Sequence, residues 1–122
     1  MVLITVAFAA MVLAQQPAET SKPELPVIKA GLGSCSADFT VKDADGKPVY
    51  GATIHVRIRY GMMSIKRMDL EISTNSDGKA RLEGLPAKAK PLTYDFEKAG
   101  QKATAEQNVA TGCQLTQEIS LK

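Results

Sequence analysis

The sequence predicts an all-β fold, a two-sheet antiparallel β-sandwich of seven short strands. From residue 34 onward, apolar side chains recur at every second position, which is the period of a half-buried strand rather than of a helix. Clusters of Gly, Pro, Asp and Asn separate these runs, as turns separate the strands of a sandwich. The 122 residues suffice for one domain with a modest core and leave no room for a second.

The strands in the first half of the domain are defined by apolar residues that alternate with polar ones. In chain order, the residues expected to face inward are Cys35, Ala37, Phe39 and Val41, then Ile54, Val56, Ile58 and Tyr60, then Met68, Leu70 and Ile72. The turn over residues 43–48 separates the first two strands, and Gly61 ends the second.

The second half of the domain continues the same pattern with weaker signals. After the turn at residues 75–78, a short strand passes through Ala80 and Leu82. A clear alternating strand follows over residues 92–96, and residues 102–110 are expected to form an edge strand. The last strand places its apolar residues on one face, with Gln117 as the polar interruption: Cys113, Leu115, Ile119 and Leu121.

Residues 1–14 are predicted to be a secretory signal peptide, because residues 2–13 are apolar except for Thr5 and a small residue, Ala14, ends the segment. The run is shorter than the roughly 20 apolar residues that cross a bilayer. No Lys or Arg precedes it, so either the natural start lies upstream or the signal is atypical; a buried strand is the alternative. Residues 15–32, with three prolines and no apolar period, are expected to be a linker, and residues 33–122 the domain.

The two cysteines, Cys35 and Cys113, are expected to form a disulfide if the protein is exported. If every connection reverses the chain, the first and seventh strands run in the same direction and both cysteines start their strands at one end. Parallel pairing of these strands would then bring the sulfur atoms together. A lipoprotein attachment box at residues 32–35 is the alternative, but polar residues and prolines separate it from the apolar run.

Two motifs carry a family resemblance: DGKPVYGATIHV at residues 45–56 and TNSDGKARLEGLP at residues 74–86. With them, roughly residues 33–122 resemble the carboxypeptidase regulatory-like domain. The resemblance implies a prealbumin-like or immunoglobulin-like sandwich, of the type grouped with carbohydrate-binding-like folds. It also implies a non-catalytic accessory or adhesion-like role in extracytoplasmic bacterial proteins. The glycines and prolines of both motifs suit turns.

The single histidine, His55, argues against the enzymatic chemistries known on related sandwiches. A transthyretin-like hydrolase of purine degradation uses several histidines and a C-terminal tetrapeptide that is not found here. Iron dioxygenases on a similar sandwich need two histidines and two tyrosines. His55 is expected on the outer face beside Arg57, solvated rather than catalytic, and no nucleophile with a matching base emerges.

Four oxygen-bearing residues in two turns at one end of the sandwich are candidate calcium ligands: Asp43, Asp45, Asn75 and Asp77. Their spacing does not match an EF-hand, and local hydrogen bonding alone favours Asp and Asn in turns. We therefore predict neither a metal site nor a cofactor. Lys88 and Lys90, near Arg81, are expected to form a small solvated basic region.

The candidate contact surface is the hairpin tip at residues 60–66, which presents Met62, Met63 and Ile65. Methionines suit adaptable protein contacts, and loops are usually polar. Folding back of the loop to cap the open end of the sandwich is the alternative. Tyr50 is the one aromatic residue expected to be exposed, and it supports a second possibility, binding of a glycan.

The expected function is therefore that of a non-catalytic binding or structural module that contacts a protein in the cell envelope or outside the cell. The alternative is a carbohydrate-binding accessory domain. The partner, protein or glycan, is not identified by the sequence. A net charge of +2 argues against nucleic acid, and the chain that remains after cleavage has no transmembrane segment. The expected location is secreted or periplasmic.

Overall fold

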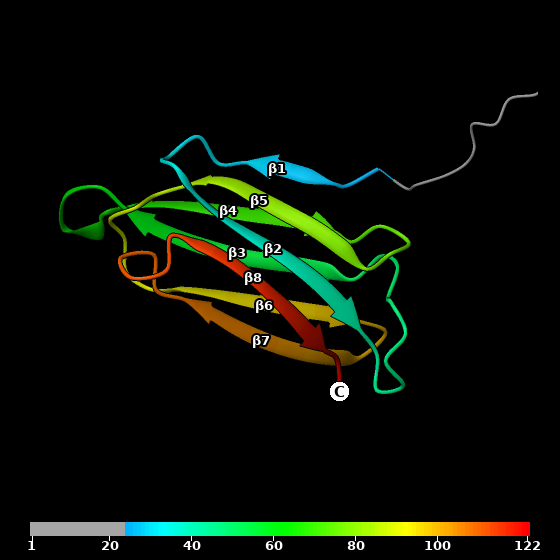
Figure 1. The fold of residues 1–122 in the computed structure, drawn as a ribbon. Helices are drawn as coiled ribbons and strands as arrows, with labels where there is room; N and C mark the ends of the chain where they lie inside the picture. Colours follow the sequence, from blue (N-terminus) through cyan, green and yellow to red (C-terminus); the bar gives the residue numbers. More distant parts are fainter. Residues whose placement is uncertain (1–23) are drawn as a thin grey trace, which may run out of the picture.

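Two four-stranded sheets pack face to face over residues 24–122, the part of the chain that the computed structural model describes (Figure 1). The sheet orders are β1-β5-β2-β8 and β4-β3-β6-β7. The elements are β1 (Val27–Lys29), β2 (Cys35–Lys42), β3 (Thr53–Tyr60), the 3₁₀ turn η1 (Met62–Ser64), β4 (Lys66–Ser73), β5 (Lys79–Leu85), β6 (Leu92–Lys98), β7 (Gln101–Gln107) and β8 (Gln114–Ser120). The predicted all-β sandwich is confirmed. The predicted signal peptide at residues 1–14 lies outside the described residues.

Strand β1 is an eighth strand that the sequence did not reveal, because it lies within residues 15–32, where we expected only a linker. It runs parallel to β5 at the edge of its sheet. The N–H of Arg81 donates to the Pro26 carbonyl at 2.9 Å, and the N–H of Ala30 donates to the Glu83 carbonyl at 2.8 Å. Such backbone pairing needs no alternation of side chains, so a three-residue strand leaves no periodic signal in the sequence.

The first and last predicted strands, β2 and β8, lie side by side in parallel, with Ala37 opposite Leu115. This confirms the direction argument made from the turns. The Cys35–Cys113 disulfide joins the starts of the two strands, with the Cα atoms 4.6 Å apart and a sequence separation of 78. Closing a loop of this length contributes about 2–5 kcal/mol by restricting the unfolded chain.

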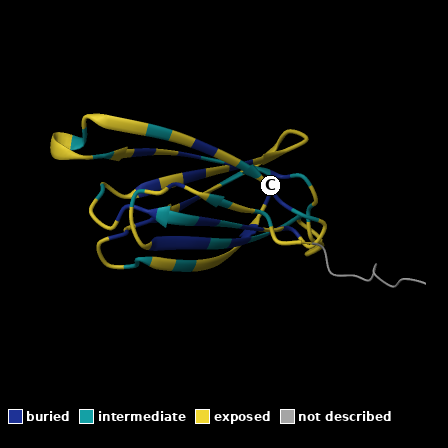
Figure 2. Cartoon of the chain, turned by 90° about the horizontal axis from the view of Figure 1, so that it is seen from above, coloured by how far each residue is buried: buried dark blue, intermediate teal, exposed yellow. Residues whose placement is uncertain are grey.

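The core between the sheets is centred on three aromatic rings. Phe39 of β2 contacts Tyr94 and Phe96 of β6 edge-to-face, with ring centroids 4.7 and 5.0 Å apart. These are the largest of the fully buried side chains, and aliphatic residues fill the space around them. Figure 2 shows the resulting alternation of buried and exposed positions along the strands. The predicted period of two is therefore the signature of this interlayer core.

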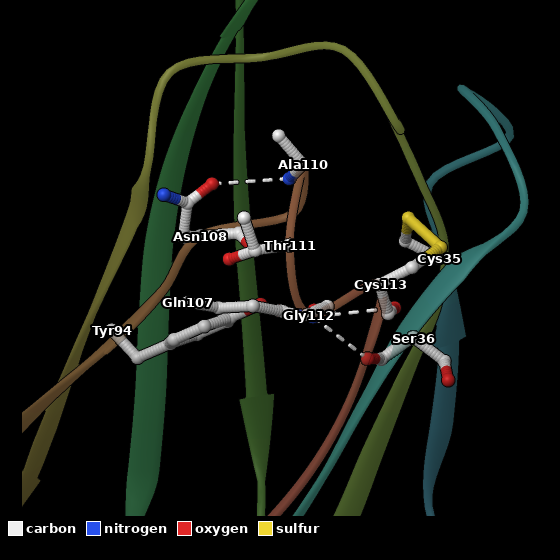
Figure 3. Close-up of a disulfide and its surroundings, with 9 residues drawn as sticks. All are labelled: Cys35, Ser36, Tyr94, Gln107, Asn108, Ala110, Thr111, Gly112 and Cys113. Atoms are coloured by element: carbon white, nitrogen blue, oxygen red, sulfur yellow. Dashed lines mark hydrogen bonds between the residues drawn. A yellow bond between two sulfur atoms is a disulfide. The ribbon is translucent and has the colours of Figure 1, made fainter.

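A buried polar cluster joins the two sheets beside the disulfide (Figure 3). The hydroxyl of Tyr94 donates to Oε1 of Gln107 at 2.6 Å. The amide nitrogen of Gln107 donates to the carbonyl oxygens of Ser36, Gly112 and Cys113, at 3.1, 2.9 and 3.3 Å. Within residues 24–122 no buried side-chain polar atom lacks a hydrogen-bond partner. Gln107 therefore connects the β6–β7 pair with β2 and with the loop that leads into β8.

In the TNSDGKARLEGLP segment, both glycines lie where another part of the backbone approaches closely. Gly78 has φ +74°, and a Cβ atom there would clash with the carbonyl oxygen of Val41. Gly84 has φ +70°, and a Cβ atom would lie 2.6 Å from the backbone nitrogen of Gly31. Both positions need glycine for conformation and for space. Thr74, which opens the segment, is buried, and its hydroxyl donates to the Val49 carbonyl at 2.6 Å.

Candidate functional site

The tip of the β3–β4 hairpin, residues 61–65, presents large apolar side chains to solvent. Met62 is 84% exposed, Met63 85% and Ile65 73%. The tip extends beyond the other loops at that end of the sandwich, and does not fold back to cap it (Figures 1 and 2). The hairpin register places Arg57 opposite Asp69 and closes the tip between Tyr60 and Lys66. The structure therefore brings together three of the four residues expected to contact a partner.

The backbone of this tip is unusual for the side chains that it carries. Gly61 has φ +83°, and the next but one residue, Met63, has φ +58°. Ser64 follows with φ +55°. Left-handed backbone costs a residue with a Cβ atom about 1 kcal/mol or more. Burial does not offset this cost at Met63, because its side chain is almost fully exposed.

The fourth expected contact residue, Tyr50, lies at the other end of the sandwich. Its ring is 68% exposed, in the loop that enters β3 at Thr53. The tip follows β3 at its far end, so an eight-residue strand, roughly 25 Å long, separates the two. Tyr50 and the hairpin tip therefore cannot belong to one small contact.

An apolar pocket of about 510 Å³ opens beside the hairpin tip, and we call it the end pocket. Tyr60 and Gly61 form its wall on the hairpin side. The opposite walls come from the loop before β2 and the loop after β5. The full lining is Leu32, Gly33, Ser34, Tyr60, Gly61, Pro86, Ala87 and Lys88. The sequence did not predict this pocket, because it is assembled from three segments far apart in the chain.

A second hollow, of about 550 Å³, lies over the outer face of β3 and β6 and is called the basic groove here. Its ionisable lining residues are His55, Arg57, Arg59, Lys90 and Asp95, and Pro91, Leu92 and Thr93 complete it. The sequence predicted His55 on the outer face and in contact with solvent. The structure places it on that face, 42% exposed, in this open groove.

Two of the groove residues share one carboxylate on β4. The Nε of Arg57 donates to Oδ1 of Asp69 at 2.9 Å, and Nε2 of His55 lies 3.6 Å from the same oxygen. The hydrogen bond from Arg57 lowers the pKa of Asp69. Asp69 therefore stays ionised and offsets the charge of Arg57, whereas no ion pair among the described residues involves Arg59.

The charged residues of the chain segments that form the tip and the loop beside it are all basic. Segments 59–68 and 86–92 contain no acidic residue, and their cations are Arg59, Lys66, Arg67, Lys88 and Lys90. Arg59 and Arg67 lie directly opposite each other on β3 and β4, an arrangement of like charges that destabilises a sheet. Arg81, which we expected near the lysines, instead lies on β5 and pairs with Asp38 and Glu83.

The two acidic turns at the opposite end use their oxygen atoms locally. Oδ1 of Asp43 accepts hydrogen bonds from the N–H groups of residues 45 and 47, at 2.9 and 3.0 Å. In the same way, Oδ1 of Asn75 accepts hydrogen bonds from the N–H groups of residues 77 and 79, at 2.9 and 3.0 Å. The bond from residue 47 is the main cause of the lowered pKa of Asp43. Over residues 24–122 no three His, Cys, Asp or Glu side chains are grouped to hold a metal ion.

Solved structures share this fold at low sequence identity. The chain aligns with catechol 1,2-dioxygenase from Pseudomonas arvilla C-1 at a TM-score of 0.57 and 13% identity, covering 80% of this chain and 58% of that one. It also aligns with the dioxygenase domain of a dioxygenase and carbohydrate-binding protein fusion from Streptomyces sp. SirexAA-E, at a TM-score of 0.53 and 14% identity. This alignment covers 88% of this chain and 96% of that domain. The chain thus spans less than two thirds of the Pseudomonas enzyme.

These likenesses show a β-sandwich similar to the sandwich part of intradiol dioxygenases, and they show the fold alone. No known family model matches the sequence. No curated protein matches it either. Within the described residues, 24–122, no helix has the length and apolar character needed to cross a membrane.

Proposed function

We propose that this protein is an exported, non-catalytic binding module that contacts a protein partner through the hairpin tip. One observation carries the proposal. Three large apolar side chains are exposed on a tip whose backbone is strained at Met63, so none of them adds to the core and the strain at Met63 costs stability. Costs of this kind are retained at contact sites, and methionine adapts well to a partner surface.

Export to the periplasm or out of the cell is supported by two independent features. The Cys35–Cys113 disulfide is typical of oxidising compartments. The predicted signal peptide at residues 1–14 points to the same location. Cys35 is fully buried in its disulfide, which leaves no thiol for lipid attachment in this fold.

We also propose, on its two turn motifs, that the chain is a carboxypeptidase regulatory-like domain. Gly78 and Gly84 support the assignment, because the close approaches at both positions require glycine. The absence of catalysis is part of the same proposal. A dioxygenase site of the kind described for related sandwiches needs two histidines, and the 122 residues contain only His55.

The test replaces Met62 and Ile65 by aspartate and measures capture of proteins from the native cell envelope. We expect the Met62→Asp, Ile65→Asp variant to lose the specifically captured protein and to keep its melting temperature, because both side chains are exposed. A matched control is Leu25→Asp, Val27→Asp, which changes two other exposed apolar residues, 44% and 42% exposed. Unchanged capture by the tip variant would refute the proposal.

A carbohydrate-binding accessory domain is the second candidate, and the exposed ring of Tyr50 favours it. Its test is retention on immobilised polysaccharide. If this function holds, Tyr50→Ala abolishes retention and the Met62→Asp, Ile65→Asp variant does not, because the two sites lie at opposite ends of β3.

A further inference from the structure

We infer that the partner presents an acidic segment with an apolar side chain. Its carboxylates would lie in the basic groove, and its apolar side chain in the end pocket. The inference rests on the proposed function and adds the chemistry of the partner. It assigns contact roles to Arg59 and Lys90, which the sequence did not single out for binding.

The basic groove and the end pocket lie on either side of the same two chain segments, the end of β3 and the loop after β5. Successive residues of a strand point to opposite sides, so Arg59 lines the basic groove while Tyr60 and Gly61 line the end pocket. In the neighbouring loop, Lys90 lines the basic groove and Lys88 the end pocket. The end of β3 and the loop after β5 thus separate the two hollows. A single extended segment that crosses them meets a basic surface on one side and an apolar pocket on the other.

The charge distribution selects an acidic partner. The five cations of segments 59–68 and 86–92 have no acidic residue among them, whereas the rest of the chain holds ten basic and thirteen acidic residues. In the basic groove, Asp69 offsets the charge of Arg57, and the one acidic lining residue, Asp95, lies opposite His55, four residues along β3 from Arg59. Arg59 and Lys90 are left to attract a carboxylate, and their field steers an acidic segment to this end.

The shape of the site favours a protein segment over an anionic membrane. A bilayer surface would cover the protruding tip and leave both hollows unfilled. Volumes of about 510 and 550 Å³ are large enough to receive side chains. Apolar contact at the tip and in the end pocket, with charged contacts at the rim, is the usual anatomy of a protein interface.

The experiment titrates the isotope-labelled protein, isolated as the cell processes it, with three short peptides followed by NMR. The first peptide alternates glutamate and leucine, the second alternates glutamate and serine, and the third alternates lysine and leucine. We expect the first to bind most tightly, with shifts confined to residues 55–65 and 86–95 and weakened by salt. The second is expected to shift only the basic groove, and the third to shift neither hollow.

Charge-reversal variants make this test specific. Arg59→Glu with Lys90→Glu is expected to weaken binding of the glutamate and leucine peptide by about tenfold or more. The matched control is Lys79→Glu with Lys102→Glu, which makes the same charge change at exposed lysines near the opposite end. This control is expected to change binding by less than about twofold. Equal effects of the two double variants would overturn the inference.

Two further outcomes separate the inference from the proposed function. If the envelope partner is lost from the Met62→Asp, Ile65→Asp variant but not from Arg59→Glu, Lys90→Glu, the binding function stands and the acidic partner is wrong. If vesicles containing phosphatidylglycerol bind the protein and the glutamate and leucine peptide does not, the occupant is a membrane and the inference is overturned. Loss of the partner from both double variants supports the inference.

Discussion

The hydroxyl of Tyr94 donates a 2.6 Å hydrogen bond to Oε1 of Gln107, and both side chains are almost wholly buried between the sheets. The other end of the Gln107 side chain donates to three carbonyl groups near the disulfide (Figure 3). A buried hydrogen-bond donor without a partner costs about 1–3 kcal/mol. The cluster therefore makes the packing of the two sheets specific as well as stable.

Replacing Gln107 by leucine is expected to lower the free energy of unfolding by about 1–3 kcal/mol, because the Tyr94 hydroxyl and nearby carbonyl groups lose their partner. The measurement is urea denaturation. Adding Tyr94→Phe should cost less in the Gln107→Leu background than in the wild type, because the hydroxyl is then already unpaired. Additive losses would show that the two side chains do not act together.

Alkaline pH is expected to destabilise the fold through Tyr94. Burial raises the pKa of Tyr94 above its ordinary value of 10.0. The folded state thus favours the neutral phenol, and its stabilising contribution is complete below about pH 10 and lost as the pH rises further. Tyr94→Phe should flatten the decline in unfolding free energy above pH 10, whereas the matched change at an exposed ring, Tyr50→Phe, should not.

Reduction of the Cys35–Cys113 bond is expected to lower the melting temperature by about 10 °C or more. The two cysteines have a sequence separation of 78, and the corresponding contribution of about 2–5 kcal/mol is a large share of the stability of a small domain. Calorimetry with and without a phosphine reductant measures the change. The Cys35→Ala, Cys113→Ala variant is the control, since the reductant should not affect it, and an unchanged wild-type melting temperature would contradict the prediction.

Met63→Gly is expected to raise the free energy of unfolding by about 0.5–1 kcal/mol, because glycine adopts φ +58° without strain and the methionine side chain is exposed. Capture of the envelope partner is expected to weaken in the same variant, because a contact side chain is removed. Stability gained with binding unchanged would mean that Met63 has no part in the contact.

The alternation of apolar residues was sufficient to predict seven of the eight strands, since a two-layer sandwich imposes a period of two on every strand with one buried face. It was misleading at Ser36, which alternates with the inward-facing Cys35 and Ala37 and is nevertheless buried beside Gln107. A register shift between Cys35 and Ala37 interrupts the regular pairing of β2 with β5 there. Gln107 itself carried no signal, because a polar residue in an edge strand normally faces solvent.

The exposed tip was predicted because three apolar residues in a loop are visible in the sequence. The end pocket and the basic groove were not predicted, because residues 55–61 meet residues 86–93 only after both sheets have formed. Alternating lysines in a loop between Pro86 and Pro91 were the one available hint.

Local chemistry, then, determined the strand pattern, the turns and the pairing of Cys35 with Cys113, because each depends on neighbouring residues or on the count of chain reversals. The tertiary structure decided the rest. It added β1 through backbone hydrogen bonds that leave no side-chain pattern, and placed Tyr50 and Met62 at opposite ends of one strand. It also gathered cations from two distant segments around the hairpin tip, since proximity in space depends on how the strands are ordered in the sheets and not on their sequence separation.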